Sequence, residues 1–375
     1  MLTYKYKLYT TKNTKHLENI LSEACFVWNH ALAMQKRYYG LYHQYINVSR
    51  LKKYFAKHIH RTYLNSQSAQ EILERLDSSY QRFFNHKSSR PPKFKKRKEF
   101  SSFVFKQCGF GLDGNTFRLN SVKKTYKFTL SRKYEGNVKQ IRVKRSRLNE
   151  WYICVITDAE SRRYGKSHNG ASVGIDFGLK TYLTTSDGVK ISNPQELKKS
   201  MNRLKTLSRK HSRCVHGSGH KERVRLSLCR CYEDVVNRRT DFQWKLAHRL
   251  CKEYDNIYLE DLNLEGMSRL WGRKMHDLGH GKFVEILSSV AVKYGCTVHK
   301  IDRYYPSSKL CTCGYKNDTL SLCDRQWVCP QCGQHHDRDV LAANNILRRG
   351  ISELSSNGKT IAHPCEAVAF ETRIP

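Results

Sequence analysis

The chain has 375 residues, which is enough for two or three domains. Its 68 Lys and Arg residues face only 33 Asp and Glu residues, so the formal net charge is +35. A charge this large favours a polyanionic partner, and nucleic acid is the expected one. No apolar run approaches the roughly 20 residues that span a bilayer, and residues 1–7 carry charges where a signal peptide has its apolar core. These features exclude a membrane protein and argue strongly against a secreted one.

The first hundred residues combine one strand with a helical block. Alternating apolar residues predict a strand over 2–8, and apolar residues at helical spacing predict three helices, at 14–42, 51–60 and 69–84. The stretch 88–98 contains Pro91 and Pro92 and cannot begin as a regular helix. It is either a basic linker or an ordered loop that binds a nucleic-acid strand.

A strand-rich region follows, at 103–105, 125–129, 141–143 and 151–156. Together with the first strand it predicts a small β-domain into which the helical block is inserted. A polar linker over 160–170 then separates this domain from a second region.

The second region alternates strands and helices. Strands are predicted at 171–176, at 181–185, directly after the turn at 186–188, at 256–261 and at 297–301. Helices are predicted at 195–213, 221–254, 281–294 and 339–349, with a hinge at Gly217–Gly219 between the first two. The pattern is that of an α/β domain.

Three acidic residues stand out in this basic chain. Asp176 and Glu260 each end an apolar strand, and Asp339 begins a helix, where the helix dipole favours a carboxylate. Taken singly, they could be a turn cap, an ion-pair partner and a helix N-cap. Taken together, they predict a cluster that binds Mg²⁺ or Mn²⁺, because oxygen ligands suit these ions and a metal pair can cleave a phosphodiester.

Four cysteines form two short motifs about fifteen residues apart: Cys311 and Cys313 in the first, Cys329 and Cys332 in the second. This spacing predicts a structural Zn²⁺ site of the ribbon type. The first motif has one residue between its cysteines instead of the usual two. Either the loop adjusts or Cys323 replaces one ligand, and His335 and His336 are spare donors.

Several segments are expected to contact nucleic acid. Long basic faces occupy 198–213 and 221–239. Two glutamines at the start of the third helix, Gln67 and Gln70, are candidates for contacts with base edges. The basic stretch supplies the candidates for backbone contacts: Arg90, Lys93, Lys95, Lys96 and Arg97.

Three stretches resemble the TnpB (OrfB) family, which insertion sequences encode and which is related to type V CRISPR effectors. They run from Gly174 to Lys180, from Leu259 to Met267, and from Cys329 through Cys332 to Ile346. The resemblance implies an RNase H-like (RuvC) nuclease domain over 171–302 and 337–375, with an inserted zinc ribbon over 303–336. It also implies a β-barrel-like wedge domain over 1–10 and 101–160 that carries a helical recognition domain over 11–100.

The family resemblance implies RNA-guided cleavage of double-stranded DNA beside a short adjacent motif, with a guide RNA from the transposon end. Asp176, Glu260 and Asp339 match the metal-binding acids, and Asp337 is a nearby acid expected not to be catalytic. The resemblance also implies that the protein is located in the cytoplasm of a bacterium or archaeon, in association with the nucleoid. A cleavage-silent RNA-guided repressor and a transposase are the alternatives. Leu341 departs from the family, which commonly has Asn at this position.

Overall fold

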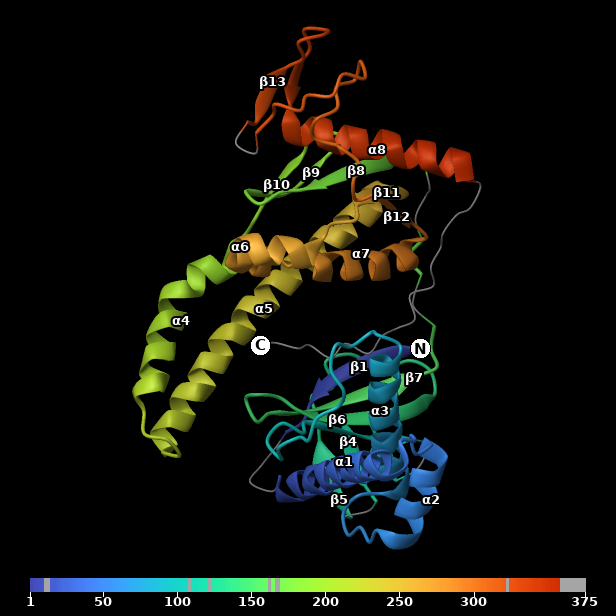
Figure 1. Ribbon diagram of the computed structural model, residues 1–375. Helices are drawn as coiled ribbons and strands as arrows, with labels where there is room; N and C mark the ends of the chain where they lie inside the picture. The colour runs from blue at the N-terminus through green and yellow to red at the C-terminus, as the bar shows by residue number, and fades with distance from the viewer. Residues whose placement is uncertain are drawn as a thin grey trace. The chain divides into compact units, whose positions relative to one another are not determined.

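The computed structural model describes residues 1–9, 14–106, 109–120, 123–160, 163–165, 169–321 and 324–357. The chain divides into two compact units, Met1–Ser161 and Arg162–Pro375 (Figure 1). In the described ranges, no helix combines the length and the apolar character needed to cross a membrane.

The first unit contains three helices and seven strands within the described residues. They are β1 Leu2–Lys7, α1 Lys15–Tyr42, α2 Val48–His58, α3 Ser66–Phe84, β2 Ser102–Lys106, β3 Phe110–Asp113, β4 Thr116–Leu119, β5 Lys124–Lys127, β6 Val138–Arg145 and β7 Trp151–Thr157. The three helices lie between β1 and β2 in sequence.

The strands of this unit form two antiparallel sheets. One has the order β1-β7-β6-β2 and the other the order β3-β4-β5. A bridge between Leu8 and Phe128 links them. The described strands therefore pair as two connected sheets, and the expected barrel-like form is met only in part. Strands β3 and β4 were not predicted because both are short and β3 contains Gly111.

The second unit is a mixed sheet with helices. Its elements are β8 Ser172–Phe177, β9 Thr181–Thr185, β10 Lys190–Ser192, α4 Glu196–Arg213, α5 Gly219–Glu253, β11 Asn256–Glu260, α6 Leu264–Leu278, α7 His280–Tyr294, β12 Thr297–Ile301, β13 Gln326–Val328, β14 His335–Asp337 and α8 Arg338–Asn357. The strand order is β10-β9-β8-β11-β12, and a separate ribbon pairs β13 with β14. Strand β8 is parallel to β11, which is parallel to β12.

Most elements of the second unit agree with the sequence prediction. Helix α5 begins at Gly219, two residues before the predicted start, and the Ser218 side chain caps it. Helix α6 was missed because Gly266 and Gly272 lower its helical propensity. Helix α8 continues to Asn357, beyond the predicted end at 349.

Helix α8 crosses the sheet beside β8 (Figure 1). Gly174 in β8 permits this close approach, since an added Cβ would overlap the Ala343 carbonyl oxygen and the Leu347 backbone nitrogen. Gly350 of α8, one turn after Leu347, permits a second close approach, since a Cβ there would overlap the Tyr258 ring. The two glycines thus fix α8 against the sheet, and with it the position of Asp339.

Replacing Gly174 with Ala is expected to lower the free energy of unfolding of the second unit by about 1–3 kcal/mol, because α8 must move away from the sheet. Urea unfolding of the two proteins measures the difference. Gly219→Ala is the control, since an added Cβ there meets nothing within 4 Å. Equal stability of Gly174→Ala and the wild type would contradict the packing described.

Candidate active site and metal centre

The three predicted acids come together at one edge of the sheet. Strands β8 and β11 are parallel neighbours, and Ile175 lies opposite Leu259, so Asp176 and Glu260 follow at matching positions. Asp339 lies in the first turn of α8, which packs against β8. All three side chains are half-buried. The structure therefore assembles residues that are far apart in sequence.

The electrostatics of the acids reflect this proximity. Burial and the negative charges of Asp339 and Glu260 raise the pKa of Asp176 to about 7. Burial, with a smaller effect of the neighbouring Asp261, raises the pKa of Glu260 to about 7. A bound cation would favour the ionised form of both carboxyl groups, so the charge and chemistry of this set suit a divalent metal.

Arg325 holds the third acid. Its Nη1 lies 2.9 Å from Asp339 Oδ1 and 3.2 Å from Oδ2, and it reaches the site from the segment just before β13. Within the described residues, the four cysteines are the group of side chains spaced to share a metal ion, with donor atoms within 4.8 Å of one another. The three carboxylates do not form such a group. Arg325 was missed by the sequence analysis because no spacing pattern linked it to the acids.

Asp337 has a structural role. Its Oδ1 accepts hydrogen bonds from the backbone N–H groups of Asp339 and Val340, so it caps α8. Its Oδ2 forms a 2.6 Å ion pair with Lys190. Burial works against these contacts, but the Lys190 ammonium and the backbone donors hold the pKa of Asp337 below its usual value. This agrees with the expectation that Asp337 is not catalytic.

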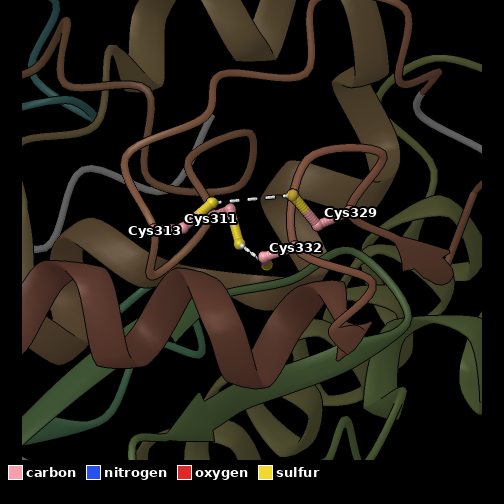
Figure 2. Close-up of side chains that lie close together, drawn as sticks. All are labelled: Cys311, Cys313, Cys329 and Cys332. Carbon is pink, nitrogen blue, oxygen red and sulfur yellow. Dashed lines mark hydrogen bonds between the residues drawn. The ribbon is translucent and has the colours of Figure 1, made fainter.

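The four cysteines converge as a candidate metal centre (Figure 2). Cys311 Sγ lies 3.6 Å from Cys332 Sγ, and Cys313 Sγ lies 3.7 Å from Cys329 Sγ. Tetrahedral Zn²⁺ with Zn–S bonds of about 2.3 Å places its sulfurs about 3.8 Å apart. The shorter Cys311–Cys313 loop therefore adjusts to the site, and the predicted four-cysteine set fits a structural zinc. Cys323 lies outside the described residues.

Hydrogen bonding prepares one of these thiols for metal binding. Burial opposes ionisation of Cys311, but the Cys313 backbone N–H and His336 lower its pKa to about 5. His336 Nε2 lies 3.0 Å from Cys311 Sγ, and the imidazole is buried. Of the two spare histidines, His336 thus contacts a ligand sulfur.

Comparison with known proteins identifies the lineage of the chain. The IS605 OrfB family model, described as a probable transposase, matches residues 153–270, and a Cas12f1-like TNB domain model matches 280–346. A Streptomyces pristinaespiralis protein named "Putative RNA-guided DNA endonuclease" is 30% identical over 93% of this chain and 89% of its own length. This chain belongs to the TnpB (OrfB) family.

Other relatives agree with the TnpB assignment. An Escherichia coli K12 protein named "Putative RNA-guided DNA endonuclease InsQ" is 27% identical over 88% of both chains. A solved Cas12f1 complex with single guide RNA and target DNA matches 90% of this TnpB chain and 83% of its own, with a TM-score of 0.62 and 16% identity. The mini-RNA-guided endonuclease Cas_phi3 has a TM-score of 0.54, with coverage of 97% and 93% and 8% identity. At these identities, the structural matches establish a shared fold.

The N-terminal match differs from its description. A helix-turn-helix domain model matches residues 1–43, but in this TnpB protein the described residues of that range, 1–9 and 14–43, contain the strand β1 and one helix, α1.

Leu341, the departure from the TnpB pattern, has a packing role. Its side chain is buried against Trp327 and the zinc-type ligands Cys311 and Cys329. An apolar residue at this position attaches α8 to the ribbon, so the substitution is explained by the ribbon core.

The basic stretch of the TnpB chain is an ordered segment along α1. Trp28 Nε1 donates to the Lys93 carbonyl oxygen at 3.1 Å, and Asn29 exchanges hydrogen bonds of 2.8 and 2.9 Å with the Lys95 backbone. The Lys95 ammonium lies 3.9 Å from the centre of the Trp28 ring. Lys95 is therefore partly a packing residue, whereas the remaining predicted cations are exposed: Arg90, Lys93, Lys96 and Arg97.

The two predicted glutamines line one hollow. It has a volume of about 260 Å³ and is also lined by Lys106, Lys139 and Gln140. Gln67 Oε1 is buried without a hydrogen-bond partner in the described part of the chain. The amide and ammonium groups that line the hollow can bind the polar groups of a ligand.

Replacing Asp176 with Asn is expected to raise the melting temperature at pH 8 in a chelator by a few degrees, since a neutral amide replaces a repelled carboxylate. The folded wild type binds this proton more tightly than the unfolded chain, so its stability falls as the pH rises from about 4 to 7. The advantage of Asp176→Asn should grow over that range and level off above it. Calorimetry at several pH values measures it. Asp241→Asn, at an exposed ion pair, should show no such trend.

Purified protein is expected to contain one Zn²⁺ per chain, measured by elemental analysis. Cys329→Ser should lose the metal and lower the melting temperature of the second unit by several degrees, because ribbon and ligands fold together. Cys214→Ser, outside the cluster, should retain it. A wild-type content well below one Zn²⁺ per chain would reject the site.

Proposed function

We propose that this protein is an RNA-guided DNA endonuclease encoded by an insertion sequence, which cuts target DNA beside a short adjacent motif. The names of the relatives, the shared fold with a guide RNA–DNA complex and the net charge of +35 support the proposal. The guide is proposed to be an RNA from the transposon end. It reads the target by base pairing, and the protein binds the backbone and the shape of the duplexes.

The convergence of Asp176, Glu260 and Asp339 is the observation that carries the nuclease assignment. These carboxylates would hold two Mg²⁺ or Mn²⁺ ions, which when bound activate water and stabilise the leaving oxygen of a phosphodiester. Asp176 and Glu260 must lose their protons first, so activity is expected to rise with pH through about 7. On this proposal the second unit is the RuvC-like domain and 303–336 is its zinc ribbon.

Arg325 would control the third ligand. Its guanidinium pairs with Asp339, so it neutralises that carboxylate and competes with a cation for it. Once Asp339 turns toward the other acids, the freed guanidinium lies where it can pair with a phosphate oxygen of the substrate. The silent-repressor alternative is disfavoured because all three acids are present and brought together.

Ribonucleoprotein is expected to cut matched duplex DNA in Mg²⁺, and Asp176→Ala should slow cutting by at least roughly 100-fold without loss of RNA binding. Gel analysis of labelled DNA measures cutting, and Asp241→Ala is the control. Binding without cutting in both Mg²⁺ and Mn²⁺ would favour the repressor, strand joining would favour a transposase, and equal cutting by Asp176→Ala would refute the site.

We further propose that the hollow at Gln67 and Gln70 contacts the adjacent motif. Glutamine amides recognise base edges in the major groove, and Lys106 and Lys139 can bind the flanking phosphates. The unsatisfied Gln67 Oε1 would accept a hydrogen bond from a base amino group.

Replacing both Gln67 and Gln70 with Ala is expected to relax the preference at one or two motif positions, by about 1–3 kcal/mol for each lost contact. Cleavage of a library with randomised flanking sequence measures the preference. Gln81→Ala, at an exposed position on the same helix, should leave it unchanged. An identical motif profile for the double variant would exclude this role.

A further inference from the structure

A row of exposed rings crosses two helices of the first unit. Phe26 and His30 of α1 have ring centroids 5.5 Å apart, His30 and Tyr54 of α2 are 6.4 Å apart and stacked, and Tyr54 and His58 are 4.9 Å apart. We call these four residues the ring row. Phe26 is 53% exposed and Tyr54 is 36% exposed. The row therefore presents its outer side to solvent.

Core packing accounts for only one side of the ring row. Helix α2 buries Leu51 and Phe55 against the rest of the unit. Tyr54 and His58 flank this buried face, and the inner sides of Tyr54 and His30 pack against Phe55, with ring centroids 5.9 and 5.5 Å away. Exposed aromatic rings grouped in this way are typical of surfaces that bind a partner.

The charge that α2 places beside the ring row is positive. The nearby acid of α1, Glu23, uses its carboxylate to bind the backbone N–H groups of residues 62–64. Helix α2 contains no acidic residue. Its Lys52 pairs with Glu74 and its Arg50 bonds Tyr38. Lys53 and Lys57 are exposed, and in the described part of the chain neither has an ion-pair partner. The row is thus bordered by free cations, which suit a phosphate backbone.

The basic segment lies along the adjacent face of α1. Cys25 and Asn29 bond the Lys95 carbonyl oxygen, and each is directly followed in the helix by a ring of the row, Phe26 and His30. Successive helical residues lie about 100° apart around the axis, so the two features are neighbouring strips. One strip offers rings and the other offers exposed cations.

We propose that the ring row stacks unpaired bases of the bound RNA while the flanking cations hold its phosphates. The inference rests on the proposed function, which supplies that RNA. Rings this close already contact one another, so bases would stack on the outer side. Loops of a folded RNA present splayed bases to aromatic side chains, whereas duplex DNA keeps its bases stacked inside. The charge disfavours a second copy of this strongly basic chain.

The test compares two double variants. The leucine variant carries Phe26→Leu and Tyr54→Leu, and the tryptophan variant carries Phe26→Trp and Tyr54→Trp. Leucine keeps an apolar surface but has no stacking face, and tryptophan keeps both. Two probes are used with the full chain: the RNA that co-purifies with it, and an unstructured RNA of repeated cytidine–adenosine steps. Tyr304→Leu, a ring replaced at a residue that is 85% exposed in the second unit, is the control.

We expect the leucine variant to bind both RNAs roughly 10-fold more weakly, the tryptophan variant and the control to bind like the wild type, and ultraviolet crosslinks to map RNA to Phe26 or Tyr54. Wild-type affinity in the leucine variant would overturn the inference and leave the proposed function intact. Crosslinks only to the DNA strand displaced from a matched duplex would overturn the inference in favour of single-stranded DNA. A dimer that is lost in the leucine variant would overturn it in favour of a second copy of the chain. A wild-type protein that binds neither RNA would instead refute the proposed function.

Discussion

Repulsion between Asp176, Glu260 and Asp339 is the constraint around which the second unit is organised. Close, half-buried carboxylates destabilise a fold unless protons or cations neutralise them. The raised pKa of Asp176 and the Arg325 ion pair are two ways of providing that neutralisation. A metal would be a third. The same carboxylates that cost stability would, in the proposed function, hold the divalent ions.

The four cysteines of the metal centre are subject to the same charge repulsion, here between thiolates. Four sulfurs within 4.8 Å cannot all be thiolates without a cation between them. The cluster lies next in sequence to β14 and α8, and Leu341 packs α8 against it. A metal bound by the cysteines would therefore support the start of α8, where Asp339 lies. Arg325, from the same ribbon, then contacts that acid directly.

The sequence predicted the elements with strong patterns. Long helices and apolar strands were found because their periodicity is independent of distant contacts. The motifs selected four cysteines that lie together in the structure and three acids that lie at one end of the sheet. It missed β3, β4, α6 and the ribbon strands, which are short or contain glycine. It also left open whether 88–98 was a linker, which the hydrogen bonds of Asn29 decide.

The sequence by itself determined the composition of the sites: a basic chain with three acids at strand and helix ends and two cysteine motifs. Only the tertiary structure decided which residues from different elements contact one another. The close approach at Gly174, the Arg325–Asp339 ion pair and the alignment of Phe26 with Tyr54 each join residues from different elements. Such contacts depend on how elements pack, and packing is set by the whole core and not by any local pattern.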